Sequence, residues 1–522
     1  MKIKITKLTH RLFNRIISFK MVEKVLNNVD KIFSDRAFPE TKKLLEELNK
    51  SDSNMPPVIK VSPKVTSFGN RIRIANLVAP DAEVFVGKLL TVGGWVKQIR
   101  TQKELIFVKL NDGSSFKDLQ VVVDKCIPEF DKLAANGVGT SLRLTGLIVK
   151  SEKSEQLVEM QISDVEKHKL SVVGECNPSE YVLHKSKPNL ETLRDICHLR
   201  PRTNSISCVA RIRNALAFAT HQFFQQRGFL YVHTPIVTGS DCEGAGEMFQ
   251  VTTVLPNPKE NINKVPITKE GLVDYSKDFF KKPAFLTVSG QLAVENFACA
   301  LSDVYTFGPT FRAENSHTTR HLAEFWMIEP EMCFADIYDD MECGENYLKY
   351  CLKWVLENNK DDLEFFDSFI EKGLIERLKN VVENSFQKIT YTECIEILKE
   401  AVLKDKKLFA EEKKKEKKEK KEKKDKEVKK EGEQTEKKEG EVVEEQQEKK
   451  EEVKKEEKKE EKKEDKRNIY WGMDMFSEHE RYLTEVVFKK PIIVYNYPKE
   501  IKSFYMRENE DQKTRSEERR VG

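Results

Sequence analysis

Apolar residues follow two periods along this chain, and the first is the alternation typical of strands. Between residues 83 and 168, apolar runs separated by polar turns predict five strands, which cover residues 89–96, 104–110, 119–123, 141–149 and 157–162. Asn111-Asp-Gly-Ser has the residue types of a turn between the second and third strands. Five short strands with such turns favour an OB-fold, a small barrel that binds oligonucleotides on one face.

The second period is helical. Six apolar residues recur at three- and four-residue steps, which predicts an amphipathic helix over residues 204–227. Gly228 ends this helix, and residues 229–237 are predicted to form a strand. Farther along, apolar residues on both sides of a polar, glycine-free loop predict an antiparallel strand–loop–strand over residues 304–331.

Candidate chemistry concentrates in this strand–loop–strand. Arg312 stands at the end of its first strand, and the second strand carries the ring of Phe325 and the carboxylates of Glu329 and Glu331. An arginine can bind a phosphate through two hydrogen bonds, and an aromatic ring can stack on a purine. These residues are therefore suited to binding ATP. A surface loop with chance charges is the alternative, but these residues fall on alternate strand positions.

The predicted barrel carries a second candidate site. Arg100, Phe107 and Gln120 are predicted to lie together on its face. An exposed ring stacks on an unpaired base, and a glutamine can hydrogen-bond a base edge. A phenylalanine in such a strand is more often a barrel-core residue. The residues alone therefore leave both interpretations open.

The stretch from Phe311 to Glu331 resembles motif 2 of the class II aminoacyl-tRNA synthetases, and it is most similar to that of the asparaginyl enzymes. The resemblance implies that Arg312 holds the α-phosphate of ATP and that Phe325 stacks on adenine. It further implies that His321 contacts the γ-phosphate, and that Glu314 contacts the adenylate and acceptor-end region.

The resemblance covers about residues 80–400 and resumes over 471–514. It implies that Arg100, Phe107 and Gln120 read the central uridine of the tRNA-Asn anticodon, a base that tRNA-Asp shares. The phenylalanine is then a stacking residue and not a core residue.

The helix–strand–proline order of residues 204–237 resembles motif 1, which implies a homodimer. An ordinary amphipathic core helix explains the periodicity equally well. The loop of residues 315–320 matches the one that meets the tRNA acceptor end in this family.

Two acidic residues are implied to bind the substrate ammonium group. Glu243 follows motif 1 in the stretch Ser240-Asp-Cys-Glu243, and Glu329 is its implied partner. A carboxylate is the natural partner of an ammonium group in a closed pocket. Ser289 and Gln291 are the implied contacts in the segment between motifs 1 and 2.

That segment also favours asparagine over aspartate. Aspartyl enzymes carry a proline and a lysine where this chain has Gly290 and Val294. Without the lysine, the side-chain carboxylate of aspartate would be buried with no cation beside it, whereas a neutral amide would not pay that cost.

Composition points to an insertion. Residues 411–466 hold 23 Lys and 23 Asp or Glu among 56 residues, and four valines are their only apolar side chains. Such a segment cannot bury a core, so a disordered Lys/Glu-rich insertion is predicted over residues 404–467, with a solvated single helix supported by Lys–Glu pairs as the alternative. Outside residues 411–466, 67 basic residues face 64 acidic ones, so charge alone does not indicate a nucleic-acid partner.

The compartment is predicted from the termini and the cysteines. Residues 1–20 hold six Lys or Arg and no acid, which fits a mitochondrial presequence or a basic extension before a start at Met21. The ten cysteines show no C-x-x-C pair, so reduced and mostly buried thiols are predicted. No apolar run approaches the length of a membrane span. We expect a cytoplasmic protein, with a mitochondrial one as the alternative.

The predicted fold is therefore of the α+β class: an OB-fold barrel followed by a class II synthetase antiparallel sheet flanked by helices. The predicted domains are an N-terminal extension and linker at 1–75, an OB-fold anticodon-binding domain at 76–170, a linker at 171–186 and an incomplete catalytic domain at 187–522.

The resemblance implies an asparagine–tRNA ligase that uses ATP and Mg²⁺. Class II enzymes also have a Gly-rich motif 3, which supplies an arginine for the ATP γ-phosphate, with an acidic Mg²⁺ ligand just before it. No stretch of this sequence after residue 344 matches that motif or that acidic residue. We therefore expect a truncated chain that does not itself catalyse, with the metal ligand in the missing part. The alternatives are an aspartyl-tRNA synthetase, an ammonia-dependent asparagine synthetase, which lacks an OB domain, and a non-catalytic RNA-binding fragment.

Overall fold

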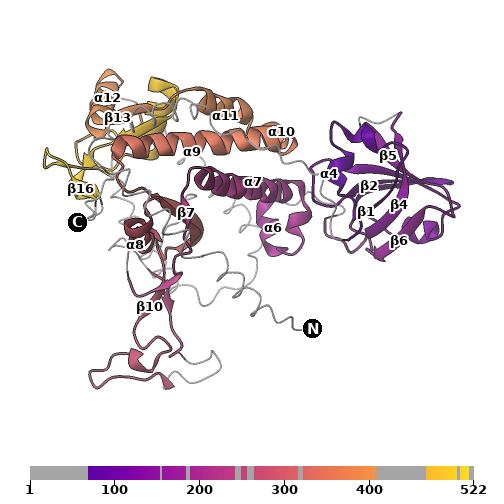
Figure 1. Cartoon of the computed structure of the whole chain (residues 1–522), viewed down its shortest axis with the longest axis horizontal. Coiled ribbons are helices and arrows are strands. Elements are labelled where there is room, and N and C mark those ends of the chain that lie inside the picture. Colours follow the sequence, from indigo (N-terminus) through magenta and orange to yellow (C-terminus); the bar gives the residue numbers. More distant parts are fainter. Residues whose placement is uncertain are drawn as a thin grey trace, which may run out of the picture. The chain divides into compact units, whose positions relative to one another are not determined.

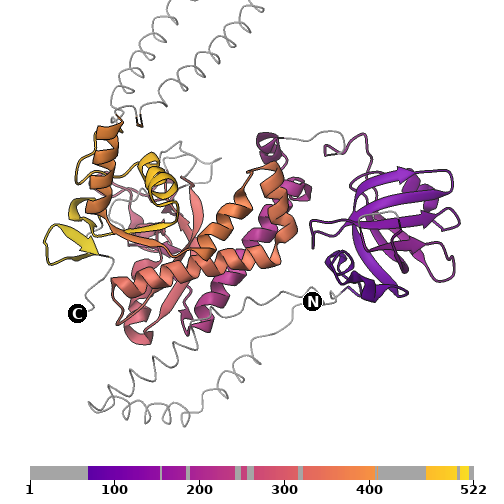
Figure 2. The ribbon, with the colours of Figure 1, turned by 90° about the horizontal axis from the view of Figure 1, so that it is seen from above.

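The computed structural model (Figures 1 and 2) describes residues 69–152, 156–183, 189–240, 248–255, 264–314, 321–405, 408–409, 466–502 and 506–516. All of them belong to one compact unit of the chain, Lys60–Gly522. The basic segment 1–20, Glu243, the loop 315–320 and the Lys/Glu segment from 410 to 465 lie outside the described residues.

Six strands form the N-terminal barrel. They are β1 (Leu89–Thr101), β2 (Leu105–Asn111), β3 (Leu119–Asp124), β4 (Ser141–Lys150), β5 (Val158–Ile162) and β6 (Lys169–Gly174). Their order is β1-β2-β3-β5-β4-β6, and β1 also pairs with β4, which closes the barrel. Alternate residues such as Ile106, Val108 and Leu110 are fully buried inside it. The five predicted strands are confirmed.

The predicted linker at 171–186 is wrong at its start. Residues 169–174 form β6, which pairs antiparallel with β4 from Thr145 to Ser141. Leu170 is the one fully buried side chain of β6, and Val173 is exposed, so the strand carries a weak apolar pattern. Ile74 and Leu77, in the short helix before the barrel, also belong to its core.

Helices make up much of the remaining described residues. The α-helices are α4 (Ile74–Leu77), α5 (Phe130–Ala134), α6 (Leu190–Asp195), α7 (Asn204–Gln226), α8 (Gln291–Leu301), α9 (Ile337–Asn358), α10 (Lys360–Phe369), α11 (Leu374–Glu383), α12 (Tyr391–Lys404) and α15 (Ser477–Arg481). Shorter turns are η1 (Ala82–Phe85), η2 (Arg200–Arg202), η4 (Tyr275–Lys277), the π-helix η5 (Tyr482–Phe488) and η6 (Lys499–Ile501). The prediction of α7 is confirmed, and Figure 1 shows α7 and α9 side by side.

The C-terminal strands are short and fall in several sheets. They are β7 (Leu230–Tyr231), β8 (Val237–Thr238), β9 (Gln250–Val251), β10 (Ala284–Leu286), β11 (Val304–Phe311), β12 (Glu324–Glu331), β13 (Gln387–Thr390), β14 (Ile492–Tyr495), β15 (Tyr497–Pro498), β16 (Arg507–Glu508) and β17 (Thr514–Ser516). The sheet orders are β8-β10-β9, β12-β11-β7, β13-β14 and β15-β17-β16.

The antiparallel strand–loop–strand is confirmed by β11 and β12, which pair from Val304 with Glu331 to Phe311 with Glu324. The predicted continuous strand over 229–237 is wrong, because β7 and β8 are separate pieces. Pro235 lies between them and has no N–H to donate to a sheet. Trp471 lies in a turn, where its indole N–H donates to Thr392 Oγ1 at 3.1 Å.

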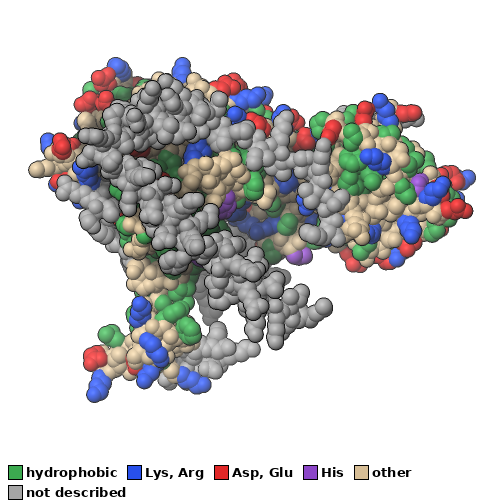
Figure 3. All heavy atoms as spheres, in the orientation of Figure 1, with side chains coloured by type: hydrophobic (Ala, Val, Ile, Leu, Met, Phe, Trp, Pro, Cys, Tyr) green, Lys and Arg blue, Asp and Glu red, His purple; other side chains and the backbone are tan. Residues whose placement is uncertain are grey.

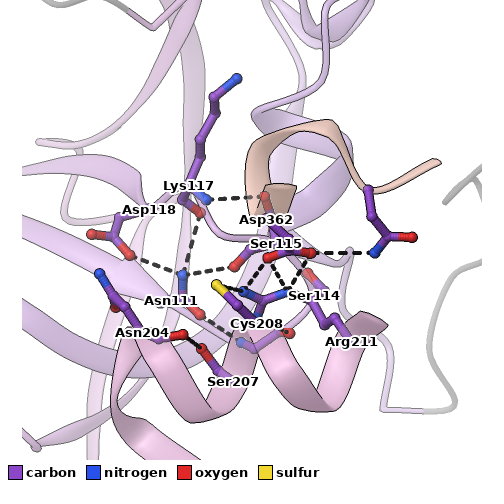
Figure 4. A network of polar contacts seen from close by, with 12 residues as sticks. Asn111, Ser114, Ser115, Lys117, Asp118, Asn204, Ser207, Cys208, Arg211 and Asp362 are labelled. Carbon is purple, nitrogen blue, oxygen red and sulfur yellow. Dashed lines mark hydrogen bonds and ion pairs between the residues drawn. The ribbon is translucent and has the colours of Figure 1, made fainter. Parts of the chain in front are cut away.

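A polar network joins the barrel turn to the helices (Figure 4). Arg211 of α7 donates to both carboxylate oxygens of Asp362 of α10, at 2.7 to 3.1 Å, and its Nη1 donates to the Gly113 carbonyl oxygen at 3.3 Å. Lys117 pairs with Asp361 at 2.8 Å. The turn that the sequence predicts at 111–114 is therefore also a contact surface.

Both ends of the Lys/Glu insertion meet at His479. The ring of Phe409 lies 4.8 Å from the His479 ring, and His479 Nε2 donates to the Lys466 carbonyl oxygen at 2.7 Å. His479 Nδ1 accepts from the Phe476 N–H at 3.3 Å, and the imidazole is fully buried. Phe409 and Lys466, the described residues next to the Lys/Glu segment, therefore both contact His479, and an insertion between two neighbouring points costs little stability.

All nine described cysteines are free, which agrees with reduced thiols. The prediction that they are mostly buried is wrong, since only Cys208, Cys351 and Cys394 are fully buried among them. No helix in the described ranges has both the length and the apolar character needed to cross a membrane.

Candidate functional site

The β11–β12 pair positions the arginine and the ring of the predicted phosphate site. The Arg312 N–H donates to the Ala323 carbonyl oxygen at 3.2 Å, which extends the ladder one step beyond β11. The Arg312 guanidinium lies 5.4 Å from the centre of the Phe325 ring, and its Nη2 is 4.0 Å from Met327 Sδ. Alternation puts Phe325, Met327 and Glu329 on one face of β12. A cation is favourable over a ring face, so this contact holds the guanidinium on that face.

Glu314 and His321 come together where the loop leaves and rejoins the hairpin. Glu314 Oε2 lies 3.5 Å from His321 Nε2, and both side chains are exposed. An exposed pair of this kind contributes little stability. Both groups can therefore turn toward a ligand at small cost.

The predicted amino-acid residues form a compact hydrogen-bonded cluster. Ser289 Oγ donates to Glu329 Oε1, and the Gly290 N–H donates to Glu329 Oε2 at 3.1 Å. Gln291 begins α8, and its N–H donates to Ser289 Oγ at 3.1 Å. Ser289 is buried and Glu329 is half-buried. Hydrogen bonds to both oxygens orient the carboxylate.

Gly290 is tightly enclosed within this cluster. A Cβ at this position would lie 2.6 Å from Thr234 Oγ1, 3.0 Å from Thr306 Cγ2 and 3.2 Å from Glu329 Oε2. Thr234 and Thr306 are themselves hydrogen-bonded, with hydroxyls 3.0 Å apart. A proline here would both meet these atoms and lose the N–H that Glu329 accepts.

Val294, which stands in place of the aspartyl lysine, is fully buried. It packs in an apolar cluster with Val232, Ala298 and Val304. An ammonium group at this position would need a carboxylate beside it to offset its burial. A lysine would therefore be unfavourable in this environment, and Val294 is not among the residues that line the cavity beside Glu329.

A small cavity borders the Glu329 carboxylate. Its lining combines aromatic and hydroxyl side chains with two glycines and comprises Tyr231, His233, Thr234, Pro235, Ile236, Thr287, Gly290, Thr306, Phe307, Gly308, Pro309, Thr310, Trp326 and Glu329. Arg312 and Phe325 are not among these residues. The amino-acid cluster and the phosphate-type pair are thus adjacent along β12 but do not share this cavity.

Helix α7 supports the back of the sheet through Tyr305. The Tyr305 hydroxyl lies 2.8 Å from His221 Nδ1 and accepts from Gln225 Nε2 at 3.3 Å. The Tyr305 side chain is fully buried, and this burial raises its pKa. The phenol therefore stays neutral and fixes β11 against α7.

The barrel residues predicted to bind a base lie together. Arg100 pairs with Phe107 across β1 and β2, and Gln120 of β3 is beside Lys109, two residues from the ring. Phe107 is half-buried and outside the core cluster, unlike its neighbours Ile106 and Val108. The structure thus decides against the core interpretation of Phe107.

Three residues of this surface were missed from the sequence. Gln98, Gln102 and Lys109 join the predicted three around a depression of about 240 Å³. Gln98, Lys109 and Gln120 form one row across three strands, next to the row of Arg100 and Phe107. The signal for Lys109 and Gln98 was available, because each lies two positions from a predicted residue on its strand.

A β-bulge aims the β1 residues at this surface. The register of β1 against β2 shifts between Val96 and Gln98, so Lys97 is an extra residue. Val96 is in the core, and strict alternation would put Gln98 in the core as well. The bulge reverses the alternation, so Ile99 packs on the core while Gln98 and Arg100 face outward.

Metal binding has no support among the described residues. None of them forms a group of three or more His, Cys, Asp or Glu that could hold an ion. The described acids around Arg312 therefore do not make a Mg²⁺ site by themselves.

Two known families match this chain, one over the part that holds the β11–β12 site and one over the barrel. Residues 189–521 match the family of class II tRNA synthetases (D, K and N). The chain belongs to the class II aminoacyl-tRNA synthetases. Residues 90–167 of this synthetase match the OB-fold nucleic acid binding domain, which agrees with the barrel of β1 to β5.

Relatives of this synthetase are asparagine–tRNA ligases. The enzyme of Protochlamydia amoebophila is 46% identical over 447 residues, covering 85% of this chain and 80% of the relative. The chloroplastic/mitochondrial enzyme of Arabidopsis thaliana is 45% identical and covers 86% of this chain and 70% of the relative.

A solved structure shares the fold of this synthetase. The asparaginyl-tRNA synthetase of Pyrococcus horikoshii, complexed with asparaginyl-adenylate, has a TM-score of 0.60 and 24% identity. It covers 86% of this chain and 80% of that one. The ligase class and the two-domain fold predicted from the sequence are confirmed.

Proposed function

We propose that this synthetase takes ATP, asparagine and tRNA-Asn as its substrates, in the two-step reaction of an asparagine–tRNA ligase. In the first step an oxygen of the asparagine carboxylate attacks the α-phosphorus of ATP. A bond forms between that oxygen and phosphorus, and the bond to the leaving pyrophosphate breaks. In the second step a 3′-terminal ribose hydroxyl of the tRNA attacks the acyl carbon, and AMP leaves.

ATP is assigned to the face of β12 that carries Arg312 and Phe325. The guanidinium neutralises charge that develops on the α-phosphate, and the ring offers a face to adenine. The distance of 5.4 Å between them lets one nucleotide contact both. His321 is assigned to the γ-phosphate, and Glu314 is assigned to the adenylate and the tRNA acceptor end. Their side chains lie 3.5 Å apart across the loop.

Asparagine is assigned to the cluster around Glu329. This cluster is the main support for the proposed function. A carboxylate oriented by hydrogen bonds from Ser289 and Gly290 is a partner for the substrate ammonium, with Glu243 as the second acid. Gln291 is assigned to the substrate side chain. The apolar surroundings of Val294 favour the neutral amide over a carboxylate.

The anticodon of tRNA-Asn is assigned to the barrel surface. Phe107 stacks on the central uridine, and Arg100 and Gln120 hydrogen-bond its phosphate or base edge. The row of Gln98, Lys109 and Gln120 lies beside this base and is suited to a neighbouring nucleotide.

The remaining assignments concern assembly, compartment and metal. A homodimer through α7 is assigned from the resemblance of residues 204–237 to motif 1. We assign the protein to the cytoplasm. Mg²⁺ bound together with ATP would neutralise charge on its phosphates, and the described residues supply no complete site for it.

Separate ligand titrations of the 522-residue chain test this proposal. Arg312→Ala should weaken ATP binding by at least tenfold and leave asparagine affinity unchanged, since one charge-assisted contact is worth about 1.5–3 kcal/mol. Glu329→Gln should do the reverse. Arg377→Ala, at an exposed ion pair on α11, is the control. If Arg312→Ala and Glu329→Gln affect both ligands equally, or neither, the assignment of the two sites is wrong.

A further inference from the structure

A basic arm with an exposed aromatic turn extends from the amino-acid cluster. This arm comprises residues 248–286, described at 248–255 and 264–286, and in Figure 1 it projects away from the region of β10. Strands β9 and β10 pair at its base, and Ser289 follows β10 by three residues. Any ligand held at the base of this arm is therefore close to the Glu329 cluster.

Asp278 fixes one turn of the arm. Its carboxylate accepts hydrogen bonds from Thr252 Oγ1 at 2.6 Å, from the hydroxyl and N–H of Thr253 at 2.6 and 3.0 Å, and from the Phe279 N–H at 2.6 Å. The Thr252 and Thr253 hydroxyls, together with these N–H groups, hold the pKa of Asp278 well below its usual range. Asp278 thus acts as a buried, ionised anchor, and it is one of three acids in the described part of the arm.

The anchored turn presents two rings to solvent. The Lys281 N–H donates to the Asp278 carbonyl oxygen at 3.2 Å, and Phe279 and Phe280 lie between them. Phe279 is 74% exposed, and its ring packs edge-on against Phe280 with centres 4.9 Å apart. Lys281 has a φ of +59°, a conformation unusual for a lysine. A fixed turn that exposes a phenylalanine in this way is typical of a binding surface.

The arm that carries these rings is also rich in lysine. Five exposed lysines lie in the described part of the arm, and Figure 3 shows blue side chains gathered around it: Lys264, Lys269, Lys277, Lys281 and Lys282. The other acids of this part are Glu270 and Asp274, and Asp274 accepts from the Ser276 N–H at 3.0 Å. The surface is therefore net positive with aromatic faces, which matches single-stranded nucleic acid.

We propose that the turn Phe279–Lys282 binds the unpaired 3′ end of the tRNA. The rings stack on unpaired bases, and Lys281 and Lys282 neutralise the adjoining phosphates. A paired stem offers phosphates but hides the faces of its bases, so the exposed rings favour the single-stranded end. This assignment rests on the proposed function, because the 3′ end must reach the Glu329 cluster, beside which the arm begins.

Two tRNA-Asn transcripts, one complete and one lacking its unpaired 3′ nucleotides, test the assignment by fluorescence anisotropy. Removing these nucleotides should weaken binding to the unmodified chain by about five- to a hundredfold, the value of one stacked base. Phe279→Ala should weaken binding of the complete transcript similarly and leave the shortened one unchanged. Phe279→Tyr keeps a ring and should restore binding, which separates stacking from a folding defect.

Phe369→Ala is the matched control, because Phe369 is 75% exposed on α10. It should change neither affinity. Equal effects of Phe279→Ala on both transcripts, or an effect on oligomeric state alone, would overturn the assignment. A failure of the proposed function would give a different result. Phe107→Ala would then leave the affinities for the complete and the shortened transcripts unchanged, whatever the effects of the arm variants.

Discussion

The backbone N–H of Gly290 donates to Oε2 of Glu329 at 3.1 Å, across 39 residues of sequence. The loop before α8 and the strand β12 are thereby joined at the point where we place the substrate ammonium. The absence of a Cβ at Gly290 permits this approach, because Thr234 and Thr306 leave no room for one.

Gly290→Ala should therefore weaken asparagine binding and destabilise the fold. Overpacking a closed site typically costs about 1–3 kcal/mol. Gly344→Ala is the control, since Gly344 lies on α9, away from the cavity lining, with open space where a Cβ would be. The measurement is asparagine affinity by calorimetry, together with urea unfolding of both variants. Equal behaviour of the two variants would show that the close contact at Gly290 has no consequence.

The barrel surface gives a second prediction. Phe107→Ala should weaken binding of the tRNA-Asn anticodon stem-loop by about 1–3 kcal/mol through loss of base stacking. Lys109→Ala should weaken it less and reduce its dependence on salt, because a lysine contributes mainly a charge. Val173→Ala, at an exposed position of β6, should have no effect. Affinity measured at several salt concentrations decides this, and an unchanged Kd for Phe107→Ala would refute the stacking role.

His479 gives a prediction about pH. Burial lowers the pKa of His479 from the ordinary value of 6.5. Just below pH 6.5 the imidazole is therefore protonated more readily in the unfolded state than in the folded state. The contribution of the neutral imidazole to the free energy of unfolding is therefore fully present above about pH 6.5, and it is lost as the pH falls below that value. Urea unfolding between about pH 7.5 and 5 should show this loss, and His479→Gln should reduce it.

The exposed His198 supplies the control for that experiment. His198→Gln should retain the pH dependence of the unmodified chain. If His479→Gln and His198→Gln have the same unfolding profile, the buried imidazole is not the group responsible.

Elements with a strong local pattern could be predicted from the sequence. The apolar periods located β1 to β5, α7 and the β11–β12 pair, because each buries one face or one stripe. Strand β6 was missed because Leu170 is its one fully buried residue, and Pro235 was not recognised as the break between β7 and β8.

The candidate site depends on contacts that no local pattern contains. The bond between Ser289 and Glu329 spans 40 residues, and it arises from the folding of α8 against the sheet. The bulge at Lys97 reverses the direction of Gln98 and Arg100, although their strand reads as a regular one. The family resemblance supplied the residues of the site, and the structure supplied their partners.

Specificity for asparagine can be measured with two non-hydrolysable adenylate analogues, asparaginyl and aspartyl. Calorimetry on the 522-residue chain should show that the asparaginyl analogue binds more tightly by at least a hundredfold, since the aspartyl carboxylate would be desolvated near Val294 with no cation in place of the missing lysine. Equal affinity for the two analogues, or tighter binding of the aspartyl analogue, would contradict the account and favour an aspartyl enzyme.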